Sequence, residues 1–208
     1  MGSGSIKAVV FDLGNVCIDF DHMIAARRIS RFAGMPAAEI FDLLFDSEIC
    51  RRFEEGRVTA AGFFSDITQT LNLNITYEEF LPIWNEIFFL TDRNSEVQRM
   101  AKRLKQDYTL AIVSNINILH FEYLKANFPF LRLFDNPVLS FEQHLRKPDE
   151  RIYKKTLEIL NLKAPEVAYT DDRREFTDKA NTLGMRSFYY QGPDKLKKDL
   201  LSVGINLD

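Results

Sequence analysis

Short apolar runs alternate with amphipathic stripes over most of this chain. Five runs rich in β-branched and aromatic residues predict strands at residues 6–11, 109–113, 137–140, 167–170 and 186–190. Between these runs, apolar positions recur at helical spacing in four stretches, at about residues 93–104, 118–127, 152–160 and 176–183. Strands that alternate with helices are typical of a parallel sheet covered on both faces. We therefore predict an α/β fold with a Rossmann-like, doubly wound sheet of five parallel strands.

The segment from residue 17 to 90 interrupts this alternation. It contains no convincing strand, and its apolar residues follow helical spacing in four stretches, 25–32, 40–44, 64–71 and 80–87. We predict an all-helical subdomain at residues 17–90, inserted into an α/β core formed by residues 6–16 and 91–208. Ten of the eighteen phenylalanines fall in this insertion, and we interpret most of them as bundle core, with one or two lining a ligand pocket.

Composition limits the possible partners. The chain has 208 residues, 46% of them hydrophobic, which is enough for a sizeable core. Its net charge of −3 gives no basic surface for nucleic acid or an anionic membrane, and no stretch approaches the roughly 20 apolar residues of a membrane span. Cys17 and Cys50 form no disulfide or zinc-binding pattern, which favours a cytoplasmic compartment. Residues 1–5 are interpreted as a flexible leader, typical of a recombinant tag.

Polar residues stand at the carboxyl ends of the first two predicted strands of the core. Asp12 follows the first strand, and Ser114 and Asn115 follow the strand at 109–113. In an open α/β sheet these strand ends border one crevice, where ligands bind. A hydroxyl and backbone N–H groups at a helix start fit a phosphate oxygen. Taken singly, Asp12 also fits an ordinary turn, and Ser114 and Asn115 also fit a helix N-cap.

Lys147 and the pair Asp171-Asp172 add charge to the same predicted crevice. Lys147 is a mobile positive charge able to neutralise phosphate, with a solvated surface lysine as the other interpretation. The adjacent carboxylates of Asp171 and Asp172 follow the strand at 167–170 and repel each other unless a cation or donors compensate. Mg²⁺ is the natural partner of such a pair, and helix capping is the competing explanation. The convergence of all these groups favours phosphate chemistry.

The segment Phe11-Asp12-Leu13-Gly14-Asn15-Val16 resembles the first motif of the haloacid dehalogenase-like (HAD) hydrolases, in the subgroup that reads DLGNV. Ser114, Lys147 and Asp171-Asp172 match the remaining three motifs in order and strand placement. The helical insertion resembles the C1 cap of subfamily IA. The resemblance implies a phosphatase in which Asp12 attacks phosphorus and forms an aspartyl-phosphate that water then hydrolyses.

The same resemblance assigns roles to the other residues. It implies Mg²⁺ as cofactor, bound by Asp12, Asp172 and the backbone carbonyl of Gly14, with Asp171 supporting. It makes Lys147 catalytic through the charge it neutralises in the transition state. Phosphate contacts are implied at Ser114, Asn115, Lys147, Gly14 and Asn15.

The first departure from the family pattern is Gly14. Most phosphatases of the family carry a second aspartate there, two residues after the nucleophile, as general acid and base. Either the leaving group needs little protonation, as in anomeric sugar, acyl or aryl phosphates, or another side chain supplies the proton. Asp19, Asp21 and His22 are the candidates. DLGNV members of the family include sugar-1-phosphate phosphatases, which fits the first possibility.

The second departure is Phe176, where the family usually has Asn or Asp. A phenyl ring cannot orient a metal-bound water, and Glu175 is the nearest substitute. Arg173 and Arg174 are predicted to be solvated, with binding of an anionic substrate group as the alternative. His120 and His144 show no partner pattern in the sequence and are interpreted as incidental.

The leading hypothesis is a Mg²⁺-dependent phosphatase acting on a small phosphorylated metabolite, with sugar phosphates among the candidates. The alternative is a catalytically impaired member of the fold that binds a phosphorylated ligand or a protein partner, which Gly14 and Phe176 favour. Asp12, Lys147 and Asp172 together favour the enzyme, and the acidic pair argues against halide removal, which needs no Mg²⁺. The sequence leaves the substrate open and allows a monomer or a homodimer.

Overall fold

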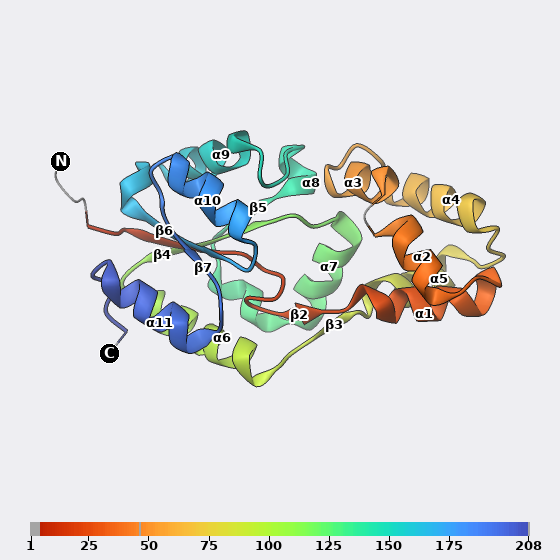
Figure 1. Cartoon of the computed structure of the whole chain (residues 1–208), viewed down its shortest axis with the longest axis horizontal. Helices are drawn as coiled ribbons and strands as arrows, with labels where there is room; N and C mark the ends of the chain where they lie inside the picture. Colours follow the sequence, from red (N-terminus) through yellow and green to blue (C-terminus); the bar gives the residue numbers. More distant parts are fainter. Residues whose placement is uncertain (1–4, 46, 208) are drawn as a thin grey trace.

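The structure, a computed structural model, describes residues 5–45 and 47–207, so residues 1–4 of the predicted leader lie outside it. Figure 1 shows a layered α/β part at one end of the long axis and a group of helices at the other. Across residues 5–45 and 47–207, every helix is too short or too polar to cross a membrane.

Five parallel strands form the sheet of the α/β part. They are β1 (Ala8–Phe11), β4 (Thr109–Ser114), β5 (Asn136–Leu139), β6 (Val167–Asp171) and β7 (Arg186–Tyr189). Their spatial order is β5-β4-β1-β6-β7, and Val10 at the centre lies beside Ala111 and Tyr169. The predicted five-stranded parallel sheet is confirmed. The strand order reverses direction between β1 and β6, which makes this boundary the topological switch point of the sheet.

Helices cover both faces of the sheet because alternate residues of β1 point to opposite sides. Val9 and Phe11 pack with α6 (Asp92–Leu104) and α11 (Pro193–Ser202), whereas Ala8 and Val10 pack with α9 (Glu150–Leu160) and α10 (Arg174–Thr182). Figure 1 shows these two helical layers above and below the strands. Full burial of a Val or Phe side chain contributes about 1.5–3 kcal/mol, so the central strand is strongly fixed. The sequence pattern did not predict α11.

The remaining core elements connect the strands. They are α7 (Ile118–Asn127), α8 (Ser140–Gln143) and two short 3₁₀ segments, Pro129–Leu133 and Ala164–Glu166.

Among the described residues of the insertion, which leave out residue 46, five helices occur in the region predicted to be helical. They are α1 (His22–Ala33), α2 (Ala37–Leu44), α3 (Glu48–Glu54), α4 (Ala60–Leu71) and α5 (Tyr77–Asn85). Their apolar faces form a separate core in which the Phe63 ring stacks on Phe53 at 4.1 Å and meets Trp84 edge-on at 4.8 Å. Most aromatic residues of the insertion therefore pack as bundle core, as predicted.

The expectation of an all-helical insertion is wrong at its two ends. The chain enters the insertion through β2 (Asp19–Phe20) and leaves it through β3 (Phe88–Phe89), and these strands pair antiparallel. Each has two residues, which is too short for the alternation that reveals a strand in a sequence. We call this pair of crossings the linker ribbon.

Replacement of Phe63 by Ala is expected to lower the free energy of unfolding by about 3–5 kcal/mol, because the ring is fully buried between two aromatic neighbours. Phe32, on the same insertion, is 49% exposed, and Phe32→Ala should change the free energy of unfolding by less than about 0.5 kcal/mol. Urea unfolding of both variants measures the difference. Equal losses would show that the described packing does not stabilise the insertion.

Candidate active site

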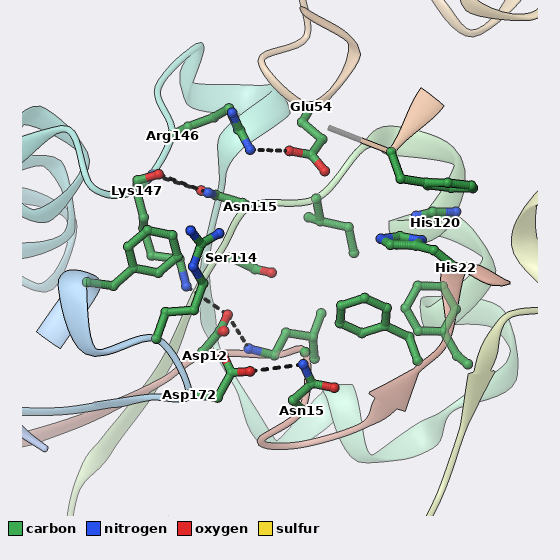
Figure 2. A pocket seen from close by; sticks show the side chains of 18 residues that line it. Asp12, Asn15, His22, Glu54, Ser114, Asn115, His120, Arg146, Lys147 and Asp172 are labelled. Carbon is green, nitrogen blue, oxygen red and sulfur yellow. Dashed lines mark hydrogen bonds and ion pairs between the residues drawn. The ribbon is translucent and has the colours of Figure 1, made fainter. Parts of the chain in front are cut away.

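The carboxyl ends of β1, β4 and β6 border a cavity of about 230 Å³ between the sheet and the insertion. Asp12 directly follows β1, Ser114 ends β4, and Asp171 ends β6. Figure 2 shows Asp12, Asn15 and Asp172 together on one side of this cavity, with Glu54 and Arg146 on the opposite side. We call the group formed by Asp12, Ser114, Lys147, Asp171 and Asp172 the polar corner. The predicted convergence is therefore observed.

Lys147 lies between two carboxylates in the polar corner. Its Nζ is 2.8 Å from Asp12 Oδ1 and 2.6 Å from Asp171 Oδ2, and the side chain of Lys147 is almost fully buried. Burial by itself would lower the pKa of the ammonium group, but Asp12 and Asp171 outweigh that effect and raise it. Lys147 therefore keeps its proton, and the interpretation as a solvated surface lysine does not apply.

The polar corner holds more negative than positive charge. Oxygen atoms of Asp12, Asp171 and Asp172 lie within 4.8 Å of one another. Burial, followed by the charge of Asp171, raises the pKa of Asp12 to about 7, although Lys147 opposes the shift. Burial also raises the pKa of Asp172. Three carboxylates around a single ammonium group fit a divalent cation bound by oxygen ligands.

Asp171 and Asp172 differ in how their oxygens are used. Asp171 Oδ2 accepts from Lys147 and from the Tyr169 hydroxyl, and Oδ1 accepts from the Arg173 amide at 2.8 Å. Asp172 is half-buried, lines the cavity and accepts from Asn15 Nδ2 at 2.9 Å. The engaged oxygens of Asp171 suit support of Lys147, whereas Asp172 is placed to contact an ion in the cavity.

Two asparagines position the charged residues. Asn15 adopts a left-handed backbone conformation with φ of 56°, which asparagine tolerates better than most residues, and this turn brings its amide to Asp172. The Asn115 side chain accepts from the Lys147 amide at 2.8 Å and donates to the Lys147 carbonyl at 3.0 Å. These paired bonds hold the Lys147 segment against the end of β4.

Helix capping does not explain the strand-end residues. The N-cap of α7 is Asn117, whose side chain accepts from the His120 amide, and α10 begins after Arg173 without a side-chain cap. Ser114 is instead buried and lines the cavity.

A comparison with models of protein families identifies the family of this chain. A model described as haloacid dehalogenase-like hydrolase matches residues 6–175. The chain belongs to this family. The hydrolase class predicted from the sequence is thus confirmed, and assignment to subfamily IA and to the DLGNV subgroup stays a prediction.

Individual relatives of this HAD hydrolase are distant. The D-ribitol-5-phosphate phosphatase of Bacteroides thetaiotaomicron is 23% identical over 204 residues, which cover 95% of this chain and 98% of that protein. The drimenol cyclase of Aspergillus calidoustus is 22% identical over 200 residues, and the match covers 95% of this chain but 36% of the cyclase. A solved HAD family enzyme from B. thetaiotaomicron, in complex with magnesium and inorganic phosphate, has a TM-score of 0.79 at 23% identity. That likeness covers 90% of this chain and 95% of the other, and it shows the shared fold.

Aromatic residues of the HAD hydrolase form the cavity wall next to the polar corner. Phe20, Phe45, Phe88, His22 and His120 all line it. We call these five residues the aromatic wall. Two of them, Phe20 and Phe88, come from the linker ribbon. Three phenylalanines of the insertion, Phe20, Phe45 and Phe88, thus line the cavity, which is more than the one or two expected.

Both imidazoles of the aromatic wall are neutral at pH 7. Burial lowers the pKa of His22 to about 4 and that of His120 to about 3. His120 Nε2 donates to the Trp84 carbonyl at 3.1 Å, and Nδ1 accepts from Asn117 Nδ2 at 3.0 Å. The interpretation of His120 as incidental is therefore wrong, because its ring connects α7 to α5 beside the cavity.

Of the three candidate proton donors, His22 alone lines the described cavity. Asp19 is buried against α6, where it accepts from Asn94 Nδ2 at 2.9 Å and pairs with Arg93. Asp21 caps α1 by accepting from the Met23 amide at 2.8 Å. Both aspartates thus have structural partners outside the cavity.

Phe176 supports cations in this structure. The Lys147 ammonium lies 5.0 Å and the Arg173 guanidinium 4.4 Å from the centre of its buried ring. Arg173 and Arg174 are exposed, as predicted, and Arg173 also pairs with Glu175 and lines the cavity. Glu175 is therefore engaged with an arginine.

The insertion touches the core on the side of the cavity opposite Asp12. Glu54 at the end of α3 forms an ion pair with Arg146 at 2.9 Å, and the Glu54 carbonyl accepts from Ser140 Oγ at 2.6 Å. His144 donates to the Glu55 carbonyl at 2.8 Å. Sequence reasoning missed Glu54 and Arg146, since no local pattern joins residues so far apart.

Acidification is expected to destabilise the protein through His120. Its pKa is about 3 in the folded state and 6.5 in the unfolded state, so below pH 6.5 the unfolded chain binds more protons. The stabilisation by the neutral ring is complete above pH 6.5 and decreases towards pH 3, with a loss of about 2–3 kcal/mol at pH 4.5. In His120→Phe this contribution is absent, so the stability gap between the native chain and the variant should narrow by that amount from pH 7 to 4.5. Urea unfolding at both pH values measures the gap, and a constant gap would contradict the buried neutral imidazole.

Proposed function

We propose that this protein is a Mg²⁺-dependent phosphatase that hydrolyses a small phosphorylated metabolite through an aspartyl-phosphate at Asp12. The observation that carries the proposal is the buried Lys147, which bridges Asp12 and Asp171 beside Asp172 at the switch point of the sheet. Such an arrangement places a nucleophilic carboxylate next to fixed positive charge. The relative named as a D-ribitol-5-phosphate phosphatase supports the same class of reaction.

The carboxylate excess of the polar corner supports a metal ion. Asp12, Asp172 and the backbone carbonyl of Gly14 would hold Mg²⁺, while Asp171 would support the site by fixing Lys147. When bound, the ion offsets the negative charge of the phosphoryl oxygens and lets one anion approach another. The solved family member that contains magnesium and phosphate supports this choice of ion.

The chain's own residues would bind the phosphoryl group around Asp12. An Asp12 carboxylate oxygen attacks phosphorus, which divides one displacement into two easier ones. The hydroxyl of Ser114 and the Lys147 ammonium would hold phosphoryl oxygens, with the backbone N–H groups of Gly14 and Asn115 as further donors. The Asn15 backbone N–H donates to the Ile18 carbonyl at 2.7 Å, so the predicted phosphate contact of Asn15 would need that bond to break. Because Lys147 is already fixed by two carboxylates, little reorganisation is needed when charge develops.

Cavity size supports a small leaving group. Sites for drug-sized ligands usually measure about 300–1,000 Å³, and this cavity of about 230 Å³ must also hold the phosphoryl group. A sugar phosphate with a single ring or a short chain fits that limit. Glu54 and Arg146 offer charged hydrogen-bonding groups to its hydroxyls, and the aromatic wall offers a surface for its C–H face.

Phosphate release from a panel of phosphorylated sugars and small acids should require both Mg²⁺ and Asp12. In Asp12→Asn the nucleophile is lost, so we expect the rate to decrease by about 10³-fold or more, and a chelator should abolish release by the native chain. Asp178→Asn, a change of the same kind at an exposed position of α10, is the matched control.

A folded native chain that releases no phosphate from any member, yet binds phosphate, would instead favour the catalytically impaired binding protein. Circular dichroism of each variant confirms folding.

A further inference from the structure

We propose that this enzyme acts on phosphate compounds whose leaving oxygen departs as a stable anion, because Phe20 occupies the space from which a proton donor would serve that oxygen. Such compounds are aryl, enol, acyl and anomeric sugar phosphates. This substrate class rests on the phosphatase function proposed above. Gly14 and Phe20 thus determine specificity together, and phosphates of primary alcohols are poor substrates.

The structure fills the position of the missing acid with hydrocarbon. A Cβ atom placed on Gly14 would lie 2.6 Å from Phe20 Cε1 and 3.2 Å from Cδ1, which is closer than such contacts allow. Gly14 is two residues from Asp12, at the edge of the cavity. The chain therefore lacks a carboxylate at residue 14 and also lacks the space for one.

The Phe20 ring is held in this place by its neighbours. It belongs to β2 of the linker ribbon, and its centre lies 6.1 Å from the ring of Phe88 on β3 and 4.8 Å from that of His22. Residues 19 and 20 pair with residues 89 and 88 across the ribbon. A ring fixed by backbone pairing and two aromatic contacts does not rotate away without cost.

Other ionisable groups around the cavity are poor sources of a proton. His22 is neutral at pH 7, since burial lowers its pKa to about 4. The Lys147 ammonium is held in the polar corner by Asp12 Oδ1 at 2.8 Å and Asp171 Oδ2 at 2.6 Å. Glu54 is the strongest rival, because burial raises its pKa. However, Glu54 pairs with Arg146, and Figure 2 shows it on the side of the cavity opposite Asp12.

The first chemical step then proceeds without protonation by the protein. An Asp12 oxygen bonds to phosphorus, the bond from phosphorus to the leaving oxygen breaks, and that oxygen departs with the electron pair as an anion. Water next attacks phosphorus of the aspartyl-phosphate and frees the Asp12 carboxylate. The phosphate that is released carries both protons of the water. In solution it passes one of them to the leaving anion. A positioned acid contributes about 10²–10⁴-fold in rate. Its absence slows most the compounds whose leaving group is an alkoxide, because that anion is the least stable.

The test is the dependence of kcat/KM on leaving-group acidity, because kcat/KM reports the step that breaks the bond to the leaving oxygen. A series of substituted phenyl phosphates in the presence of Mg²⁺ changes acidity with little change of shape. The 1-phosphate and 6-phosphate of one sugar provide a second comparison. We expect a steep increase of kcat/KM with acidity and a preference of about 10²–10⁴-fold for the 1-phosphate.

Variants assign the effect to Phe20 and Gly14. The double variant Gly14→Asp with Phe20→Ala provides both a donor and the space for it, and it should flatten the dependence by accelerating the least acidic members. Phe20→Ala alone provides space without a donor and should keep the steep dependence. Glu54→Gln should also keep the steepness, and a further steepening would identify Glu54 as the donor and overturn the proposal.

The native chain alone decides the matter if the double variant fails to fold. A shallow dependence, with the sugar 6-phosphate hydrolysed as fast as the 1-phosphate, would overturn the leaving-group restriction and leave the phosphatase function intact. Absence of hydrolysis throughout the series, by protein with a native circular dichroism spectrum, would overturn the phosphatase function and the restriction with it.

Discussion

The buried contact of Lys147 with Asp12 and Asp171 is the interaction on which the rest of the site depends. Removal of charged groups from water is costly, and loss of one partner of a buried pair typically destabilises a protein by about 3–5 kcal/mol. Several features of the fold keep these groups together. Neighbouring strands β1 and β6 bring the two carboxylates to one edge of the sheet, and Asn115 fixes the lysine backbone by two hydrogen bonds. The switch point of the sheet thus creates a charged corner in an otherwise apolar core.

The cavity joins this charged corner to a wall without charge. Burial, together with the negative charge of Asp171, raises the pKa of Asp12 to about 7. Burial also keeps the imidazoles of His22 and His120 neutral. A ligand therefore meets the charges of the polar corner at its phosphoryl end. At the other end it meets the packing surface of the aromatic wall and the charged pair of Glu54 and Arg146. Because Phe20 and Phe88 belong to the linker ribbon, the segments that join the insertion to the core also shape the space for the leaving group.

The sequence predicted the parts of this structure that depend on local patterns. The five strands were visible as short β-branched runs, and Asp12, Ser114, Lys147 and Asp172 were found from their places near strand ends. The missed features depend on contacts between distant segments or on very short elements. Glu54 meets Arg146 across the boundary between insertion and core, His120 reaches the Trp84 carbonyl, and each strand of the linker ribbon has two residues. The spacing of apolar residues along the chain does not predict such contacts between distant segments. The hydrogen bond from Asn94 to Asp19 could not be predicted for the same reason.

Charge balance gives a physical reason for glycine two residues after Asp12. Three carboxylates already surround the single ammonium of Lys147, and their repulsion and burial hold the pKa of Asp12 far above its ordinary value. A fourth carboxylate at residue 14 would raise that pKa further and make the nucleophile harder to ionise, unless it stayed protonated itself. The Phe20 ring next to Gly14 occupies that position without adding a charge. Glycine at residue 14 thus lets Asp12 ionise more easily than a carboxylate there would, but it also removes a proton donor. The leaving group must therefore be stable as an anion without protonation by the protein.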